Sequence, residues 1–285
     1  AGNFKLSGPA PTSPAVDTGT TNGLMQYDAM AVQGYARDMG AIESPFTNDA
    51  TTNDYYVDDA FNIGDLYTPG AIGTDANDGR TPVTPKRTLT NLLSTYDLDP
   101  GDSVYIDAGS YTNGTTRITN LDADGTVALP IQFRGPTNAG SSPAVFSNFV
   151  LRDGFVFSNA RNVWLLGNIV VRRYTNGIRV VATASSTNNE FRGLTLILNI
   201  NSGILLDGAS VSGNRVASNT IRGPGQNYGV HLTGGAHGNS ITNNPAIARN
   251  VLYGVAGFTA ASNNRIVRNM IFSNLFSGVL MNGAN

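Results

Sequence analysis

The segment NEFRGLTL, residues 189–196, is the first of four related segments in the C-terminal part of the chain. The others are NRVASNTI at 214–221, NSITNN at 239–244 and NRIVRNMI at 264–271. Their leading asparagines, Asn189, Asn214, Asn239 and Asn264, are therefore evenly spaced along the chain. The apolar residue two places on recurs in step, as Phe191, Val216, Ile241 and Ile266, and a second asparagine column runs Asn219, Asn244, Asn269. A fixed period of about 20 to 50 residues is the signature of a solenoid or a repeat array.

The apolar runs inside each period are short and end at Gly or Asn, which favours strands over helices. A glycine followed by a β-branched residue also recurs, at Gly177-Ile178, Gly203-Ile204, Gly229-Val230, Gly254-Val255 and Gly278-Val279. Two or three short strands with Asn and Gly turns describe one coil of a parallel β-helix, in which coils stack about 4.8 Å apart. We therefore predict an all-β, right-handed parallel β-helix, a single-stranded solenoid with stacked asparagines. Leu196, Ile221 and Ile271 should form a second buried column beside that of Phe191.

The amino-acid composition agrees with this fold and limits the kinds of binding partner to be expected. Only 13% of the 285 residues are charged and 33 are glycine, which suits a solenoid with many turns. The net charge of −2 gives no reason to expect nucleic acid or an anionic membrane as partner. The chain has no cysteine, which excludes disulfides and thiolate metal sites, and no apolar run approaches the roughly 18 residues of a membrane span.

Residues 55–111 read as the start of the β-helix. Tyr55-Tyr56-Val57 predicts a strand, GTDANDG at 73–79 a tight loop, residues 88–95 a short capping helix, and PGDSVYI at 100–106 a return to strand. The helix would bury Leu89, Leu92 and Leu93. This series resembles the N-terminal cap and first coil of the pectate-lyase-like β-helix proteins that bacteria secrete. The resemblance implies the fold but no particular activity, because the fold hosts lyases, epimerases, hydrolases and non-enzymes.

Residues 1–46 have a different character. SPAVDTGT at 13–20, followed by RDMGAIE at 37–43, resembles the closing segment of such a β-helix, although an ordinary N-terminal arm is the alternative. Residues 47–54 form a polar linker, and 55–285 the β-helix. If the N-terminus were placed after residue 285, Asn3 would fall at 288, next to the position near 289 where another leading asparagine is due. We expect the arm to complete the open end of a neighbouring β-helix, head to tail.

The regular coils offer little for catalysis. After Leu151 the acidic residues are Asp153, Glu190 and Asp207, and no lysine follows Lys86. Lyases need a strong base and clustered carboxylates for Ca²⁺, and hydrolases need two facing carboxylates. Glu190 and Asp207 should lie on different faces, so no such pair is expected. We predict no catalytic residue and no cofactor.

A possible metal site remains open in the GTDANDG loop. Asp75, Asn77 and Asp78 could bind Ca²⁺, but their spacing departs from the EF-hand, and a turn held by Asx hydrogen bonds is the favoured interpretation. A glycosylation sequon, Asn113-Gly114-Thr115, has meaning only outside the cytoplasm.

Other side chains have a functional and a structural interpretation. His231 and His237, the two histidines, could form an acid–base pair, but isolated surface histidines in turns are commoner. Trp164 could stack on a sugar, but it precedes Phe191 by the same interval as Asn162 precedes Asn189, which favours the core. Two outward columns are expected: Arg179, Leu205, His231, Ala256 and Leu280, and Glu190, Arg215, Ser240 and Arg265. In the second column a surface ion pair of Glu190 and Arg215 is favoured over a catalytic role.

These patterns favour a structural, non-enzymatic β-solenoid unit, outside the cell or on its surface, that assembles with itself into a filament or tandem array. The alternatives are a polysaccharide lyase or epimerase acting on acidic glycans, and a glycan-binding module. The module would need a row of exposed aromatic residues, which the regular coils do not display in sequence.

Overall fold

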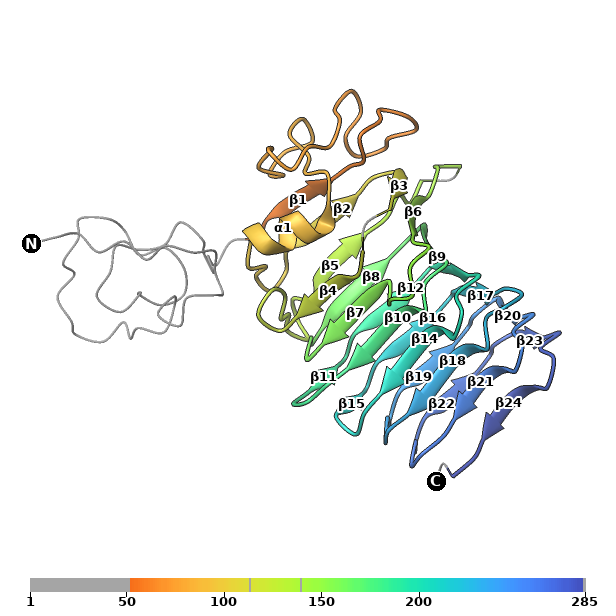
Figure 1. Cartoon of the computed structure of the whole chain (residues 1–285). Helices are drawn as coiled ribbons and strands as arrows, with labels where there is room; N and C mark the ends of the chain where they lie inside the picture. Colours follow the sequence, from red (N-terminus) through yellow and green to blue (C-terminus); the bar gives the residue numbers. More distant parts are fainter. Residues whose placement is uncertain (1–51, 113, 139, 284–285) are drawn as a thin grey trace, which may run out of the picture.

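The computed structural model describes residues 52–112, 114–138 and 140–283. The proposed arm at 1–46, most of the linker at 47–54 and Asn113 of the sequon lie outside these residues. The described chain forms a right-handed parallel β-helix, which confirms the predicted fold class (Figure 1). The figure shows the coils stacked one on the next, from β1 at one end to β24 at the other.

Three long parallel sheets run the length of the solenoid. Sheet 1 consists, in hydrogen-bonded order, of β1 (Asp54–Val57), β2 (Ser103–Ile106), β5 (Ile131–Arg134), β8 (Val163–Leu166), β12 (Glu190–Arg192), β16 (Arg215–Ala217), β19 (Ser240–Thr242) and β22 (Arg265–Val267). Sheet 2 consists of β3 (Gly109–Tyr111), β6 (Ala144–Ser147), β9 (Ile169–Arg172), β13 (Thr195–Ile197), β17 (Thr220–Arg222), β20 (Ala246–Ala248) and β23 (Ile271–Phe272). Sheet 3 consists of β4 (Thr116–Thr119), β7 (Phe155–Ser158), β10 (Asn176–Val181), β14 (Ser202–Asp207), β18 (Tyr228–Thr233), β21 (Tyr253–Gly257) and β24 (Ser277–Met281). A short ladder of β11 (Ser186–Thr187) and β15 (Val211–Ser212) lies at the corner between sheets 3 and 1.

The apolar columns of the repeat form the core. Phe191, Val216, Ile241 and Ile266 pair in register across sheet 1, the first three fully buried. In sheet 2, Leu196 pairs with Ile221, and Ile271 joins the same column through Ile247. The register of both predicted columns is therefore confirmed, and only their last members, Ile266 and Ile271, are partly and not fully buried. Ile247 escaped the prediction because its coil carries one extra residue between columns.

The glycine column at the start of the sheet 3 strands has a steric cause. A Cβ on Gly203 would lie 2.4 Å from the side chain of Ile221 and 2.8 Å from the carbonyl oxygen of Gly229. A Cβ on Gly229 would lie 2.4 Å from the carbonyl oxygen of Gly254. Neighbouring coils therefore approach too closely at this position for any side chain.

Three ladders of side-chain amides run along the corners. In the first, Asn189 Nδ2 donates to Asn214 Oδ1 at 2.9 Å, and Asn214 Nδ2 to Asn239 Oδ1 at 3.0 Å. The second follows the predicted column of Asn219, Asn244 and Asn269. A third, which the sequence analysis missed, consists of Asn199, Gln226, Asn250 and Asn274. Its glutamine and its uneven spacing conceal it from a search for one residue type at one period.

The left-handed backbone at these corners belongs to the residue before each ladder asparagine. Asn188 has φ 57°, Ser218 φ 57° and Asn243 φ 53°. The ladder asparagines are instead buried, and their side chains bond both amides and backbone of neighbouring coils. Turn formation and amide stacking are thus divided between adjacent positions.

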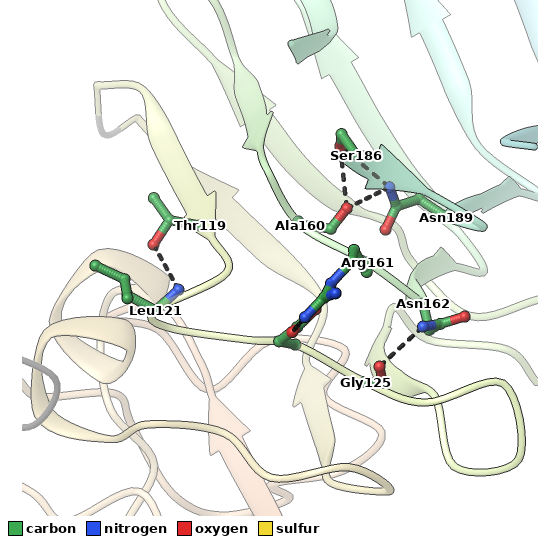
Figure 2. A network of polar contacts seen from close by, with 9 residues as sticks. Thr119, Leu121, Gly125, Ala160, Arg161, Asn162, Ser186 and Asn189 are labelled. Carbon is green, nitrogen blue, oxygen red and sulfur yellow. Dashed lines mark hydrogen bonds and ion pairs between the residues drawn. The ribbon is translucent and has the colours of Figure 1, made fainter. Parts of the chain in front are cut away.

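The first ladder begins one residue away from where the period placed it. Asn189 Oδ1 accepts from the N–H of Val163, so Val163 occupies the ladder position. Asn162 instead donates from Nδ2 to the carbonyl oxygen of Gly125 (Figure 2). For the same reason Trp164 pairs with Glu190, and Leu165 pairs with Phe191. The prediction that Trp164 is a core residue is wrong, because this coil is one residue shorter than the interval that the prediction assumed, and the shift turns Trp164 outward.

The end formed by the earliest described residues is covered by α1 (Leu89–Thr95), which Figure 1 shows beside β1 and β2. Thr88 caps the helix by accepting from the N–H of Asn91, and Leu89, Leu92 and Leu93 are buried as predicted. The helix thereby shields apolar side chains of the first coils from water. Among the described residues, no helix is long and apolar enough to cross a membrane.

Candidate functional site

The outer face of sheet 3 brings together charges that are far apart in sequence. Arg179 on β10 lies between Asp153, just before β7, and Asp207 at the end of β14. Its Nη1 is 3.7 Å from Asp153 Oδ2, and its Nη2 is 3.2 Å from Asp207 Oδ2. The three residues span three successive coils.

This charged group is held by amide side chains of the preceding corners. Asn176 Nδ2 donates to Asp153 Oδ1 at 2.8 Å, and Asn201 Nδ2 donates to Asn176 Oδ1 at 3.0 Å. The Nε of Arg179 is shielded from solvent without a hydrogen-bond partner among the described residues. The guanidinium therefore has hydrogen-bonding capacity that the protein leaves unused.

Next to the charged group, aromatic rings continue along the same face. Tyr228 on β18 stacks against Tyr253 on β21, with ring centroids 6.1 Å apart and planes 16° apart. Phe258 meets both tyrosine rings on edge, and Phe276 lies 6.1 Å from Tyr253. We call the row of Tyr228, Tyr253, Phe258 and Phe276 the aromatic row.

His231 joins the charged group to the aromatic row. Its ring lies 4.4 Å from Tyr228 and meets Phe258 on edge at 5.4 Å. Burial lowers the pKa of His231, against an opposing effect of Asp207. The imidazole is therefore neutral at neutral pH, and its Nδ1 is shielded without a partner among the described residues.

The arrangement can recognise a ligand that is both amphipathic and rich in hydroxyl groups. Flat aromatic faces offer apolar contact, while carboxylates, a guanidinium and a neutral imidazole beside them offer donors and acceptors at fixed positions. Carbohydrates have both properties. The ladder register of sheet 3 holds these side chains on a rigid surface.

Several sequence predictions meet on this face. The column of Arg179, Leu205, His231, Ala256 and Leu280 is confirmed strand by strand. Glu190 and Asp207 lie on different sheets, as expected. Asp153 and Asp207 share this face and both contact Arg179, a proximity that the sequence did not reveal. An aromatic row was not evident in the sequence of the regular coils, whereas Tyr228 and Tyr253 stack there across neighbouring strands.

The two histidines occupy separate elements. His231 lies within β18 and not in a turn, whereas His237 continues the short ladder of β11 and β15 through bridges to Ser212 and Ser262. Its Nδ1 lies 3.2 Å from the carbonyl oxygen of Gly235. No contact joins the two rings in the described structure.

The outer face of sheet 1 carries the second predicted column. Glu190 Oε1 contacts Arg215 Nη1 at 2.5 Å and Arg192 Nε at 2.8 Å. Trp164 lies beside Glu190 in this column and is half-buried. Both arginines are substantially exposed, whereas Glu190 is largely buried, so two solvated guanidinium groups share one shielded carboxylate.

The GTDANDG loop uses its polar groups within the protein. Asp75 accepts from the N–H and hydroxyl of Thr88, and Asp78 accepts from the N–H of Arg80 and the hydroxyl of Thr84. The ammonium of Lys86 donates to the carbonyl oxygens of Asp75 and Asn77 at 3.3 and 2.8 Å. Lys86 thus provides a positive charge inside the loop that was considered for Ca²⁺.

The fold and this face define a parallel β-helix protein whose outer surface carries an ordered group of charged and aromatic side chains. The family model described as "Periplasmic copper-binding protein (NosD)" matches residues 138–284, just over half of the chain, and the chain belongs to this family. Among solved structures, one titled "Crystal structure of pectate lyase Pel9A" is similar, with a TM-score of 0.48 and 16% identity over 82% of this chain and 71% of that chain. No curated protein matches the chain.

The family description raises the question of copper. Copper in proteins is bound mainly by imidazole, thiolate and thioether groups. The chain has two histidines, five methionines and no cysteine. The two imidazoles lie on separate elements, and the described methionines, Met270 and Met281, are exposed on the last coil. Within the described ranges, no group of three His, Cys, Asp or Glu residues is arranged to hold an ion. The described residues do not fit a copper site of this kind.

Proposed function

We propose that this protein is a non-cytoplasmic β-helix protein that binds carbohydrate along the outer face of sheet 3. The family description, which names a periplasmic protein, supports the location. The aromatic row carries the proposal for the ligand, because Tyr228 and Tyr253 stack across neighbouring strands and Phe276 extends the row beside Tyr253. A polysaccharide lying along the solenoid axis would meet the rings first and then the charged group of Asp153, Arg179 and Asp207.

The neighbouring sheet gives a useful contrast. Tyr56 and Tyr105 on sheet 1 also stack, with centroids 5.4 Å apart. The ring of Tyr67 covers Tyr105 on edge, and its hydroxyl donates to the carbonyl of Gly135. That pair serves to hold a loop in place, whereas no loop is anchored over Tyr253 and Phe276 by a described hydrogen bond.

The test is binding of a panel of neutral and acidic polysaccharides, including pectate and alginate, by affinity electrophoresis and calorimetry. We expect the double variant Tyr228→Ala/Tyr253→Ala to weaken binding about tenfold or more. Tyr105→Ala, which removes a stacked tyrosine from the other sheet, is the matched control and should bind as wild type. Equal binding by both variants, or no binding to any polymer in the panel, would contradict the proposal.

A second proposal concerns assembly. The last coil presents apolar side chains to solvent, among them Met270, Leu275, Phe276 and Met281. Within the described residues, β22, β23 and β24 pair on one side only. Exposed strand edges of this kind accept further strands. We propose that residues 1–46 of another copy supply them, which would build a head-to-tail filament or array.

Removal of residues 1–46 tests the assembly proposal. The shortened chain should remain folded by circular dichroism but sediment as a monomer under conditions in which the full chain associates. Electron microscopy of the full chain should show filaments that the shortened chain does not form. An unchanged sedimentation profile would rule out a role for the arm.

A further inference from the structure

Four aspartates gather at the end of the solenoid covered by α1. Asp58 and Asp107 directly follow β1 and β2, which pair in parallel so that Val57 lies beside Ile106. Asp59 and Asp65 belong to the loop that continues from β1 (Figure 1). Asp58 and Asp107 are fully buried, and Asp59 is 8% exposed.

Two of the four carboxylates are fully used by the protein. Asp107 accepts hydrogen bonds from the N–H groups of Leu66, Tyr67 and Thr68 at 2.6 to 2.7 Å, and from the Thr68 hydroxyl at 2.9 Å. Asp59 accepts from the N–H groups of Phe61 and Ser110, both at 2.7 Å. These bonds fix the loop and explain why the two side chains are buried.

The other two carboxylates have oxygens without donors. Oδ2 of Asp58 is shielded from solvent and receives no hydrogen bond from the described residues, while its Oδ1 accepts from the N–H of Asp59. Both carboxylate oxygens of Asp65 are likewise shielded and unpartnered among the described residues. Three anionic oxygens are therefore withdrawn from water with nothing bound to them, which is costly unless another group satisfies them.

The surroundings make this cost larger. Burial and the charges of Asp65 and Asp107 raise the pKa of Asp58 to about 7, against the opposing effects of the nearby Thr68 hydroxyl and of the hydrogen bond from the N–H of Asp59. Burial and the charges of Asp107 and Asp59 raise the pKa of Asp65 to about 6. Every charge that shifts these two groups is another carboxylate, and no described ion pair involves either. The cluster lacks a positive charge.

We propose that Asp58 and Asp65 bind a calcium ion. The free donors are all carboxylate oxygens, which hard cations prefer over copper or zinc. Ca²⁺ takes about six to eight oxygen ligands in flexible geometry, so two carboxylates with three free oxygens leave room for carbonyl oxygens and water. The described residues contain no ready group of three acidic, His or Cys ligands, and the proposed site has two. This is neither the GTDANDG loop nor the outer face of sheet 3.

The ion would fasten the loop after β1 to the first coils. Asp58 is continuous with β1, whose register with β2 is fixed, while Asp65 lies in the loop that Asp107 positions. A cation between them would replace mutual repulsion by attraction to both. Because the site exists only in the folded chain, calcium should stabilise the fold by linkage.

The experiment uses the full chain after removal of metal at pH 7.5. Calorimetry with CaCl₂, and sensitised luminescence with Tb³⁺, should reveal one site per chain. CaCl₂ should raise the melting temperature by on the order of 5 °C. Asp65→Asn should abolish both the binding and the calcium-dependent rise, while its metal-free form melts no lower than metal-free wild type because a like charge is removed. Asp124→Asn, which removes the surface partner of Arg161 elsewhere in the structure, should bind calcium as wild type.

A proton shared by Asp58 and Asp65 is the rival way to relieve the cluster. In that case wild type would show no calorimetric signal with CaCl₂ up to about 10 mM, roughly ten times the weakest dissociation constants of extracellular calcium modules. Stabilisation of Asp65→Asn without any calcium effect on wild type would overturn the proposal. Calcium binding that persists in Asp65→Asn but is lost in a sheet 3 variant would also overturn it.

Discussion

The two ends of the solenoid treat buried polar atoms in opposite ways. In the later coils, Asn214 accepts two bonds from Asn189 and gives its own donors to Ser186 and Asn239. At the earlier end, Asp58 and Asp65 bury oxygens that no described group satisfies. Repetition explains the difference, because an amide carries both donor and acceptor and can satisfy its own copy one coil away. A carboxylate carries acceptors only and repels its copy.

The largest loss of stability is expected from a change that buries an unsatisfied charge inside the repeat. Replacing Ile241 by Asp would place an unpaired charge in a fully buried column, with no donor in the neighbouring coils. We expect a loss of about 4 kcal/mol or more in the free energy of unfolding. Ser240→Asp puts the same charge one residue away on the outer face and should change stability little. Denaturant titration of both variants is the measurement, and equal losses would contradict the assignment of faces.

Interruption of one amide ladder should have a smaller effect. Asn214→Ala removes the acceptor of Asn189 and the donor to Asn239, and leaves buried groups unpaired on both sides. A loss of about 2 to 3 kcal/mol is expected from the usual cost of such groups. Asn282, an exposed asparagine, supplies the control through Asn282→Ala. A loss no greater than in that control would mean that the ladder contributes little.

The earlier end should respond to pH in the opposite direction from most proteins. The folded pKa values of Asp58 and Asp65, about 7 and about 6, lie above the ordinary value of 3.8. Their protonated forms therefore favour the fold, and this stability is present at low pH and lost as pH rises towards about 7. In metal-free protein, we expect the loss of this contribution to lower the melting temperature by on the order of 3 °C between pH 4.5 and 7. The same scan on Asp65→Asn should show a weaker fall, and an unchanged slope would refute this origin.

The smallest effect is expected on the outer face of sheet 1. Glu190→Gln removes the charge that Arg192 and Arg215 share, but both arginines are exposed and keep their hydration. Less than about 1 kcal/mol should be lost, and the difference should shrink at high salt. Thermal melts at low and high ionic strength provide the check. A large, salt-independent loss would show that the network is more than a solvated ion pair.

The sequence was informative wherever coils keep one length. Phe191, Val216 and Ile241 recur at a constant interval, and the register follows directly. Prediction failed for Trp164, because the preceding coil departs from that length by one residue and one residue reverses a side chain's direction in a strand. The stacked asparagines were foreseen for two of three corners.

The candidate sites could not be predicted from the sequence, for a related reason. Asp153 reaches Arg179 only because the coil between Asp153 and Asn176 is shorter than the regular ones. Asp58 and Asp65 are close because a loop folds back under bonds to Asp107. A change in coil length and a loop that folds back leave no periodic pattern in the sequence. The roles of Asp153, Asp58 and Asp65 were therefore not visible there.

The amide ladders also give the solenoid an electrical direction. In all three, the side-chain oxygen of each ladder residue accepts from the coil before it, as Asn214 Oδ1 does from both the backbone N–H and the Nδ2 of Asn189. The small dipoles of the side chains therefore add along the axis, as peptide dipoles do in a helix. Two such rods placed with like ends together would set these dipoles against each other, whereas an unlike pair would align them.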